Sequence, residues 1–530
     1  MPKSTRTRLA VIVLAALLAS LAGLRWGLPN QHHVNTYNCD ENTPIAHLQS
    51  MDPGKLDFNP VGEKTPYALG EGTFHLYTFA ASLKALSVAG LLTLTPDKDF
   101  YYANPGEWGK FYLAGRALSA LYGALAAAAL CLLGTAMFGP AAGFLAGLFL
   151  ALAPAHSIFS RYLVMNVPGL FWIVLTLLLL KRLMDSGETR FYLLAAVTTG
   201  LAVSTRYSAA PLLLPFLAAH LLGPRRREMK PLLLAVPAAA SAFFIGTPYA
   251  LLDYPGFIKG TGALANTVSN GSSAGIFSGL LKVWASLREG LGVGVAAASL
   301  AGLGLSAFRR TKNDLLLAAW TLPLLVIFVK AGQAASSGRM LPVLPFLALL
   351  GARLLAEAGE KFRAAKALPL LVLVNLLVLQ AAAARLALKE DSRDSASGWL
   401  LANARPGAVI GLLREPSWFG PGVLERKYRH PSYEGLRNVR LVPLGSGDWR
   451  NAVGYDLLGQ ARPDLVVTTD IETAFTDEPG LLAALDKAGY APAAEFRENF
   501  SLFGLALREK MPELFFKPAR INIYAAKGKN

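Results

Sequence analysis

The chain has 530 residues, of which 53% are hydrophobic and only 16% are charged. A soluble globular protein carries about 25% charged residues, so this composition excludes an ordinary soluble enzyme. The net charge of +16 does not indicate a nucleic-acid-binding protein, because residues 391–530 are nearly neutral, with 18 Lys and Arg against 17 Asp and Glu.

The positive charge lies in short loops between long apolar runs. These loops read "KRLMDSGETR", "GPRRREMK", "FRRTK" and "EKFRAAK", and short basic loops mark the cytoplasmic side of a membrane protein. A helix needs about 20 apolar residues to cross a bilayer, and runs such as "LSALYGALAAAALCLLGTAMFG" are long enough. The sequence therefore predicts a polytopic α-helical membrane protein.

The N-terminus reads as a basic start, "MPKSTRTR", followed by the apolar stretch "LAVIVLAALLASLAGL". We interpret it as a retained first membrane helix whose N-terminus lies in the cytoplasm. A cleavable signal peptide is the competing interpretation, because "ASLAG" offers small residues for cleavage.

Residues 29–112 form a polar, acidic segment that we place outside the membrane as the first outer loop. Within it, "TFHLYTFAASLKALSVAGLLTL" is apolar but contains His75 and Lys84. We predict a helix that lies in the outer membrane interface. A membrane span is the alternative, but it would place the later basic loops outside, against the positive-inside rule.

Further apolar segments predict ten more spans, so that about 11 transmembrane helices result and the C-terminus lies outside. A longer outer loop is predicted from Asp253 to about Arg288. The ten predicted spans cover residues 113–137, 141–156, 166–183, 191–205, 208–222, 231–250, 291–307, 314–331, 341–356 and 367–387.

The tail has a different composition, and we predict a boundary between a membrane domain, 1–390, and a small extracytoplasmic α/β domain, 391–530. "DSRDSASGWLLANARPG" is typical of a helix start. Strand-like runs follow in "AVIGLL", "RLVPL", "DLVVTTD" and "INIYAA", and the helix "GLLAALDKAGY" lies between the last two.

Two adjacent carboxylates, Asp40 and Glu41, follow the first predicted span in "CDENTPIAHLQ". The pattern is typical of a helix start, where acidic side chains meet the positive end of the helix dipole. Such a start would hold a carboxylate on a rigid element near the membrane surface. A solvated loop turn is the competing interpretation.

Four arginines lie near span ends on the same predicted side: Arg116, Arg161, Arg206 and Arg339. Guanidinium groups match phosphate oxygens two at a time, which makes arginine a preferred phosphate ligand. Contact with lipid headgroups is the alternative. A carboxylate with several arginines at one membrane surface would suit chemistry on a phosphate-bearing lipid.

Over most of its length the chain resembles the polyprenyl-phosphate-sugar-dependent glycosyltransferases of the GT-C superfamily, especially the protein O-mannosyltransferase and aminoarabinose-transferase type. The likeness rests on the "DE" after the first span, on "LDFNP", and on "GPAAGFLAGLFLALAPAHSIFSRYL", "AVTTGLAVSTRYSAAPLLLP" and "GRMLPVLPFLALLGARLL". Two departures stand out. Many relatives carry an acidic residue where this chain has Asn166, and its absence here argues against a metal bound by a carboxylate. Relatives also usually carry Lys in place of Arg206.

The resemblance implies an inverting glycosyltransferase in which Asp40 is the base. Glu41 would then hold the fold or the acceptor, and the four arginines would bind the donor phosphate. His75, Tyr207 and Asn166 are candidates for the acceptor or sugar pocket, with a satisfied interfacial role as the alternative for His75. The expected partners are a polyprenyl-phosphate-linked sugar and an acceptor protein, glycolipid or polysaccharide, at a bacterial or archaeal plasma membrane.

Other functions stay open at this point. A transporter or flippase of lipid-linked sugars would carry charge inside its spans, but here the charged residues gather at the span ends. A non-catalytic membrane scaffold is a third interpretation. His32 and His33 are too few ligands for a metal site, so we expect no cofactor and no tightly held metal. A divalent metal remains the alternative.

Overall fold

The computed structural model describes residues 3–269, 275–332, 336–413, 419–424, 439–444, 462–470, 478–497, 501–502, 505–506 and 520–527. The chain divides into two compact units, which do not coincide with the predicted boundary at residue 391. The first contains Met1–Leu24, Thr43–Leu86 and Ala114–Ala384. The second contains Arg25–Asn42, Ser87–Leu113 and Arg385–Asn530. The segment that carries Asp40 thus belongs to the same unit as the tail.

Six helical segments in the described part of the chain are long and apolar enough to cross a membrane. Shorter apolar helices lie at Pro140–Leu152 (α6), Tyr207–Leu222 (η4 and α10) and Val293–Arg309 (α15). A helix lies in every predicted span, including α9 (Thr189–Thr205) and α17 (Leu344–Lys361). The number of membrane crossings stays a prediction. The six long segments are α1 (Lys3–Leu21), α5 (Pro105–Phe138), α8 (Asn166–Ser186), α11 (Met229–Gly246), α16 (Lys312–Ala331) and Arg363–Asn403, which includes α18 (Leu368–Leu388).

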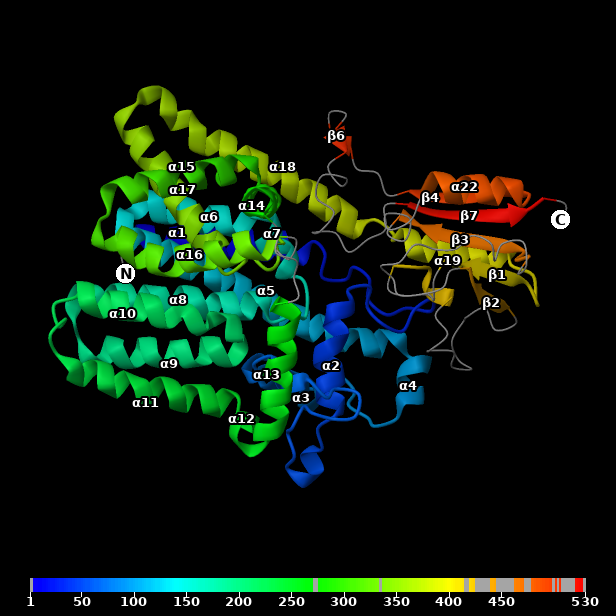
Figure 1. Cartoon of the computed structure of the whole chain (residues 1–530), viewed down its shortest axis with the longest axis horizontal. Coiled ribbons are helices and arrows are strands. Elements are labelled where there is room, and N and C mark those ends of the chain that lie inside the picture. The colour runs from blue at the N-terminus through cyan, green and yellow to red at the C-terminus, as the bar shows by residue number, and fades with distance from the viewer. Residues whose placement is uncertain are drawn as a thin grey trace. The chain divides into compact units, whose positions relative to one another are not determined.

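Small residues allow close packing between these helices, as expected for membrane helix pairs. A methyl group added at Gly302 of α15 would lie 2.3 Å from the carbonyl oxygen of Leu350 in α17. The backbones of the two helices are therefore in contact, and any larger side chain at Gly302 would separate them. Helices α8, α9 and α11 of the first unit also pack side by side (Figure 1).

The segment predicted as the first outer loop, residues 29–112, includes the α-helices α2 (Asn42–Gln49), α3 (Phe74–Val88) and α4 (Lys98–Ala103). The predicted interfacial helix corresponds to α3. At a rise of 1.5 Å per residue, its 15 residues extend about 22 Å, whereas the apolar core of a bilayer is about 30 Å thick. Its length therefore favours the interfacial position over a span.

The segment predicted as an outer loop, from Asp253 to about Arg288, is largely helical among its described residues, and its position outside the membrane stays a prediction. It contains α13 (Tyr254–Ser269) and α14 (Ile276–Leu291) and is preceded by α12 (Tyr249–Leu252). Ile276, Phe277 and Leu280 are exposed on α14. Residues at this spacing share one face of a helix, so α14 is amphipathic. This pattern is not visible from the length of continuous apolar runs, on which the predicted spans were based.

The "LDFNP" motif is fixed to α12 and the residue that follows it. The Tyr249 hydroxyl donates to Asp57 Oδ1 at 3.0 Å and accepts from the Phe58 backbone N–H at 2.8 Å. Asn59 Nδ2 donates to Asp253 Oδ2 at 2.9 Å. These contacts join two segments that are far apart in the sequence.

The tail forms the predicted α/β fold. Its five-stranded sheet has the order β2-β1-β3-β7-β4, in which β2, β1 and β3 are parallel and β7 runs antiparallel to β3 and β4. Helix α19 (Ser392–Asn403) packs against one face of the sheet and α22 (Glu478–Lys487) against the other (Figure 1). The strands are β1 (Val409–Leu412), β2 (Arg440–Pro443), β3 (Leu465–Thr469), β4 (Tyr490–Arg497) and β7 (Arg520–Ala526), and a separate small pair comprises β5 (Ser501–Leu502) and β6 (Leu505–Ala506).

Candidate active site

Asp40 and Glu41 lie in η1 (Cys39–Glu41), a single 3-10 turn that leads directly into α2. Asn38 precedes this turn, and its Oδ1 accepts a hydrogen bond from the Asp40 backbone N–H at 3.2 Å. A side-chain acceptor at this position replaces the missing partner of a first-turn N–H. The helix start predicted from "CDENTPIAHLQ" is therefore confirmed.

The two carboxylates have different surroundings. Glu41 is fully buried, and its Oε2 accepts a hydrogen bond from Thr36 Oγ1 at 2.8 Å. Asp40 is exposed. A buried, hydrogen-bonded carboxylate holds a loop together, whereas a general base must reach the proton that it accepts. This difference favours Asp40 over Glu41 for chemistry.

The reactivity of Cys39, which is next to Asp40, can report whether this turn keeps its structure. Burial raises the pKa of the Cys39 thiol from 9.0 to about 11, and the charge of Asp40 adds to the effect. The thiol Sγ lies 3.7 Å from Asp40 Oδ1. Because the thiolate is the reactive form, Cys39 should alkylate slowly at neutral pH as long as the turn keeps this structure.

Two of the four predicted phosphate ligands are buried near the C-terminal end of α1. Arg116 is fully buried, and its Nη1 donates to Leu24 O at 2.7 Å. Arg161 is 4% exposed, and its Nη2 donates to Ala19 O at 2.7 Å. Ala19 O is one of the last carbonyls of α1, which have no partner inside the helix, and Leu24 O lies in the turn that follows it. Cations stabilise this end of a helix. These contacts favour a structural role for both arginines.

The other two arginines lie in loops that contact the first turn of α8. Asn166, the first residue of α8, donates from Nδ2 to Gly338 O at 3.2 Å, next to the exposed Arg339. A methyl group added at Gly169 would lie 3.5 Å from Cβ of the half-buried Arg206. Loops that are far apart in the sequence thus bring Arg206 and Arg339 to the start of one helix. We call Asn166, Gly169, Arg206, Gly338 and Arg339 the α8 cluster.

An aromatic cluster adjoins the second turn of α8. It consists of Phe74, His75, Tyr122, Phe171 and Trp172. The His75 and Tyr122 rings lie 6.1 Å apart, Tyr122 and Phe171 lie 5.5 Å apart, and Phe74 and Trp172 lie 5.8 Å apart, centroid to centroid.

Neither ring nitrogen of His75 nor Nε1 of Trp172 has a hydrogen-bond partner among the residues that the structure describes. Burial lowers the pKa of His75 to about 4, so its imidazole is neutral at pH 7. It offers one donor and one acceptor. Aromatic surface with a few unmatched polar atoms is typical of a ligand-binding site.

Tyr207 directly follows Arg206. Its hydroxyl donates to Leu69 O at 3.2 Å, and its ring contacts Phe243 and Phe257. The loop that carries Arg206 and Tyr207 and the loop that carries Arg339 thus both contact the first turn of α8, which begins at Asn166, while His75 belongs to the aromatic cluster.

A family model described as dolichyl-phosphate-mannose-protein mannosyltransferase matches residues 109–251, a stretch that contains five of the nine predicted site residues. ArnT from Cupriavidus metallidurans bound to undecaprenyl phosphate is similar in structure, with a TM-score of 0.51, 14% identity and 98% of both chains covered. The chain has a GT-C fold.

Two further solved structures are similar at lower TM-scores. AglB, an archaeal oligosaccharyltransferase from Archaeoglobus fulgidus in complex with an inhibitory peptide and a dolichol-phosphate, gives 0.48 with 14% identity, over 95% of this chain and 74% of that one. The arabinofuranosyltransferase AftD from Mycobacteria gives 0.47 with 15% identity, over 99% of this chain and 40% of that one. A comparison with curated proteins gave no significant match.

The GT-C resemblance is confirmed by the family match and the shared fold with ArnT, and the family match indicates a glycosyltransferase. The apolar helices and this fold together define an integral, multi-pass membrane protein.

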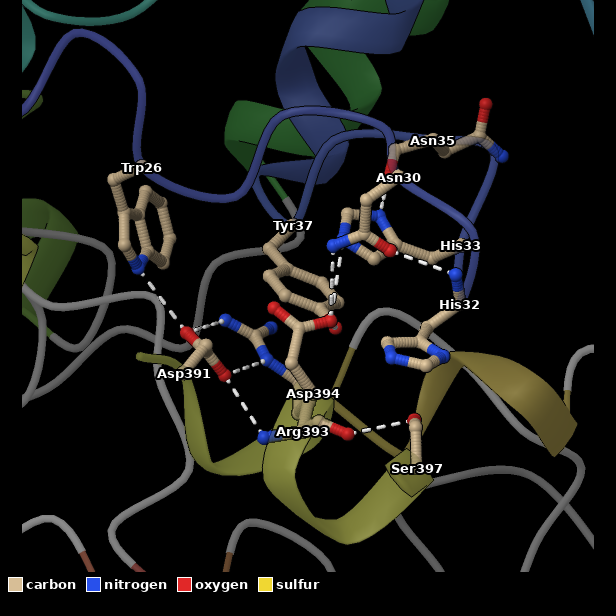
Figure 2. A network of polar contacts seen from close by, with 10 residues as sticks. All are labelled: Trp26, Asn30, His32, His33, Asn35, Tyr37, Asp391, Arg393, Asp394 and Ser397. Atoms are coloured by element: carbon tan, nitrogen blue, oxygen red, sulfur yellow. Dashed lines mark hydrogen bonds and ion pairs between the residues drawn. The ribbon is translucent and has the colours of Figure 1, made fainter. Parts of the chain in front are cut away.

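The unit that contains the tail holds a buried polar cluster that was not predicted from the sequence (Figure 2). We call Trp26, Tyr37, Asp391, Arg393 and Asp394 the Arg393 cluster. "DSRDS" was interpreted only as a helix start. The available signal was an arginine between two aspartates in that motif, because a buried arginine requires carboxylate partners.

His33 packs against this cluster, and its ring stacks on Tyr37 at 4.0 Å between centroids. Burial lowers the pKa of His33 below 6.5 despite the nearby Asp394 carboxylate. An unfolded imidazole therefore takes up a proton that the folded one resists. We expect the free energy of unfolding to fall as the pH drops below 6.5. Thermal denaturation in detergent between pH 8 and pH 5 measures this effect, which should be smaller in His33→Gln. An equal pH dependence in both proteins would contradict the assignment.

Proposed function

We propose that this chain transfers a monosaccharide from a polyprenyl-phosphate carrier to an acceptor on the extracytoplasmic side of the membrane. The α8 cluster carries the proposal, because two arginine-bearing loops meet at one helix start in a chain with a GT-C fold. The basic loops between the spans support the placement of this end of α8 on the outer side.

The start of α8 would bind the donor phosphate. The first N–H groups of a helix lack partners within it, and the helix dipole favours an anion there. Arg206 and Arg339 add two positive charges in loops that contact this turn. ArnT, which shares the fold, was solved with undecaprenyl phosphate bound. Of the four predicted phosphate ligands, we therefore propose these two as direct contacts.

The reaction would be a single displacement at the anomeric carbon. An acceptor oxygen or nitrogen forms the new bond to this carbon on the face opposite the phosphate. The old carbon–oxygen bond breaks, and its electron pair leaves with the polyprenyl phosphate. Asp40 takes the proton from the acceptor, and the arginines stabilise the growing charge on the phosphate. One displacement inverts the anomeric configuration.

The aromatic cluster would contact the sugar or the acceptor. Its aromatic surface suits a sugar ring, and His75 and Trp172 hold buried polar atoms that hydroxyl groups would satisfy. Asn166 and Tyr207 lie beside the phosphate site in this scheme. No step uses a metal ion or an organic cofactor, so transfer should persist in EDTA.

The test uses purified protein in sealed proteoliposomes with radiolabelled pentose and hexose donors on undecaprenyl phosphate. Membrane extracts supply acceptor protein, glycolipid and polysaccharide. We expect one donor to yield labelled product and free undecaprenyl phosphate. Movement of intact donor across the bilayer without release of undecaprenyl phosphate would overturn the proposal in favour of a flippase.

A further inference from the structure

The segment that carries Asp40 is attached to the first helix of the tail. Residues 25–42 and the tail belong to one compact unit. Figure 2 shows side chains of this segment converging on the start of α19, where Asp391 and Arg393 lie. Asp391 is the N-cap residue of α19, and its side chain accepts from the Arg393 backbone N–H. A helix terminus thus provides the attachment point.

Arg393 lies at the centre of this contact and is fully buried. Its Nε and Nη2 donate to the two carboxylate oxygens of Asp391 at 2.7 and 2.9 Å. The guanidinium carbon lies 3.6 Å from the centre of the Tyr37 ring and 5.7 Å from that of Trp26. Trp26 Nε1 in turn donates to Asp391 Oδ2 at 3.1 Å.

Asp394, at the start of the same helix, makes a second set of contacts with the segment. The Tyr37 hydroxyl donates to Asp394 Oδ1 at 2.8 Å, and Asn30 Nδ2 donates to the same oxygen at 3.1 Å. Tyr37 is therefore held at both its ring face and its hydroxyl. A buried ion pair contributes little net stability compared with apolar packing, but it requires one specific geometry.

Hydrogen bonds between the residues on either side of Tyr37 link its chain neighbours to η1. Thr36 Oγ1 donates to Glu41 Oε2 at 2.8 Å, and the Glu41 backbone N–H donates to Asn38 O at 3.1 Å. Asn38 Oδ1 accepts from the Asp40 backbone N–H. Only Asn38 and Cys39 separate Tyr37 from Asp40, and the bonds of Thr36 and Asn38 hold this short interval from both sides. A shift of Tyr37 would therefore displace η1.

We propose that Arg393 is a positioning residue for Asp40, and that the tail thereby holds the catalytic turn in its working conformation. This inference rests on the proposed function, in which Asp40 is the base. It assigns the tail a role in the turnover step of the reaction. Arg393 itself touches neither donor nor acceptor in this scheme.

The first test measures the position of η1 without any substrate. In a Cys131→Ala background, Cys39 is the remaining thiol, and its alkylation by N-ethylmaleimide is followed at pH 7.5. Arg393→Gln should release the turn and accelerate alkylation by up to about 100-fold, the factor for a pKa that returns from 11 to 9.0. Arg497→Gln is the matched control, because Arg497 is an exposed arginine of the same unit that pairs with Glu495, and its rate should not change.

The second test measures sugar transfer with the active donor. Arg393→Gln should lower kcat by about 100-fold, the loss expected when a reacting group is displaced by about 1 Å. Binding of undecaprenyl phosphate should stay unchanged. In an Asp40→Asn background, Arg393→Gln should cause little further loss, because the positioned group is already absent. Tyr37→Phe, which removes only the hydroxyl to Asp394, should give a smaller effect and serves if Arg393→Gln does not fold.

The outcomes separate this inference from the proposed function. Unchanged Cys39 reactivity and unchanged kcat in both variants would overturn the inference alone. A full further loss in the Asp40→Asn background would also overturn it, because Arg393 would then act through general stability. If Asp40→Asn itself transfers sugar at the parent rate, the proposed base fails, and the Cys39 measurement still decides whether Arg393 positions the turn.

Discussion

Replacement of Asp40 by Asn should lower kcat by about 10²–10⁴-fold, the usual contribution of a general base. Asn keeps the size of the side chain and accepts a hydrogen bond, but it takes no proton at neutral pH. The Asp40 backbone N–H bonds to Asn38 in either protein, so the turn should keep its structure. Binding of undecaprenyl phosphate should hardly change, because the α8 cluster would hold the phosphate. Initial rates and donor titration measure the two quantities separately.

Glu41→Gln is the matched control for this substitution. Glu41 is fully buried and accepts a hydrogen bond from Thr36, and a Gln carbonyl accepts the same bond. We therefore expect a smaller loss of kcat with Glu41→Gln than with Asp40→Asn, in protein shown to be folded. If Glu41→Gln were the more damaging change at equal folded yield, Glu41 would replace Asp40 as the base.

Replacement of Arg206 or Arg339 by Gln should weaken donor binding. Loss of a charge-assisted hydrogen bond typically costs about 1.5–3 kcal/mol, which corresponds to an increase of about 10- to 150-fold in the dissociation constant. KM for the donor and the Kd of undecaprenyl phosphate should both rise. The combined variant should lose less than the sum of the single losses if both arginines contact one phosphate.

Two controls define this result. Arg190→Gln should leave donor binding unchanged, because Arg190 is an exposed arginine of the same unit that pairs with Glu188. Arg116→Gln should lower folded yield more than donor affinity, because the buried Arg116 side chain holds the Leu24 carbonyl. Unchanged donor binding in both Arg206→Gln and Arg339→Gln would contradict the phosphate site and favour contact with lipid headgroups.

Much of the fold followed from local patterns. Apolar runs located a helix in every predicted span, and β-branched runs such as "DLVVTTD" located strands β1, β2, β3 and β7. Strand β4 was missed because "YAPAAEFR" contains Pro and three Ala, which are poor strand formers. It lies at the sheet edge, where Pro492 is tolerated. Strand β4 forms because it pairs with β7, and such long-range pairing cannot be predicted from a local sequence pattern.

The candidate site was likewise predicted only where it depends on residues close together in the sequence. Asp40 was identified from its neighbours in the chain, because a helix start is a local feature. The sequence did not distinguish the four arginines from one another as phosphate ligands, since each lies near a span end. Only tertiary contacts separate Arg116 and Arg161, which bond to backbone carbonyls near the end of α1, from Arg206 and Arg339 beside α8. The Arg393 cluster joins residues more than 350 positions apart and has no local signature.

The anomeric configuration of the transferred sugar tests the central claim most directly. Purified protein is incubated with one stereochemically defined polyprenyl-phosphate donor and its acceptor, and NMR determines the linkage in the product. A single displacement with Asp40 as the base predicts a product of inverted configuration, formed together with one equivalent of free polyprenyl phosphate. A product with the configuration of the donor, or donor consumption without sugar transfer, would contradict the mechanism.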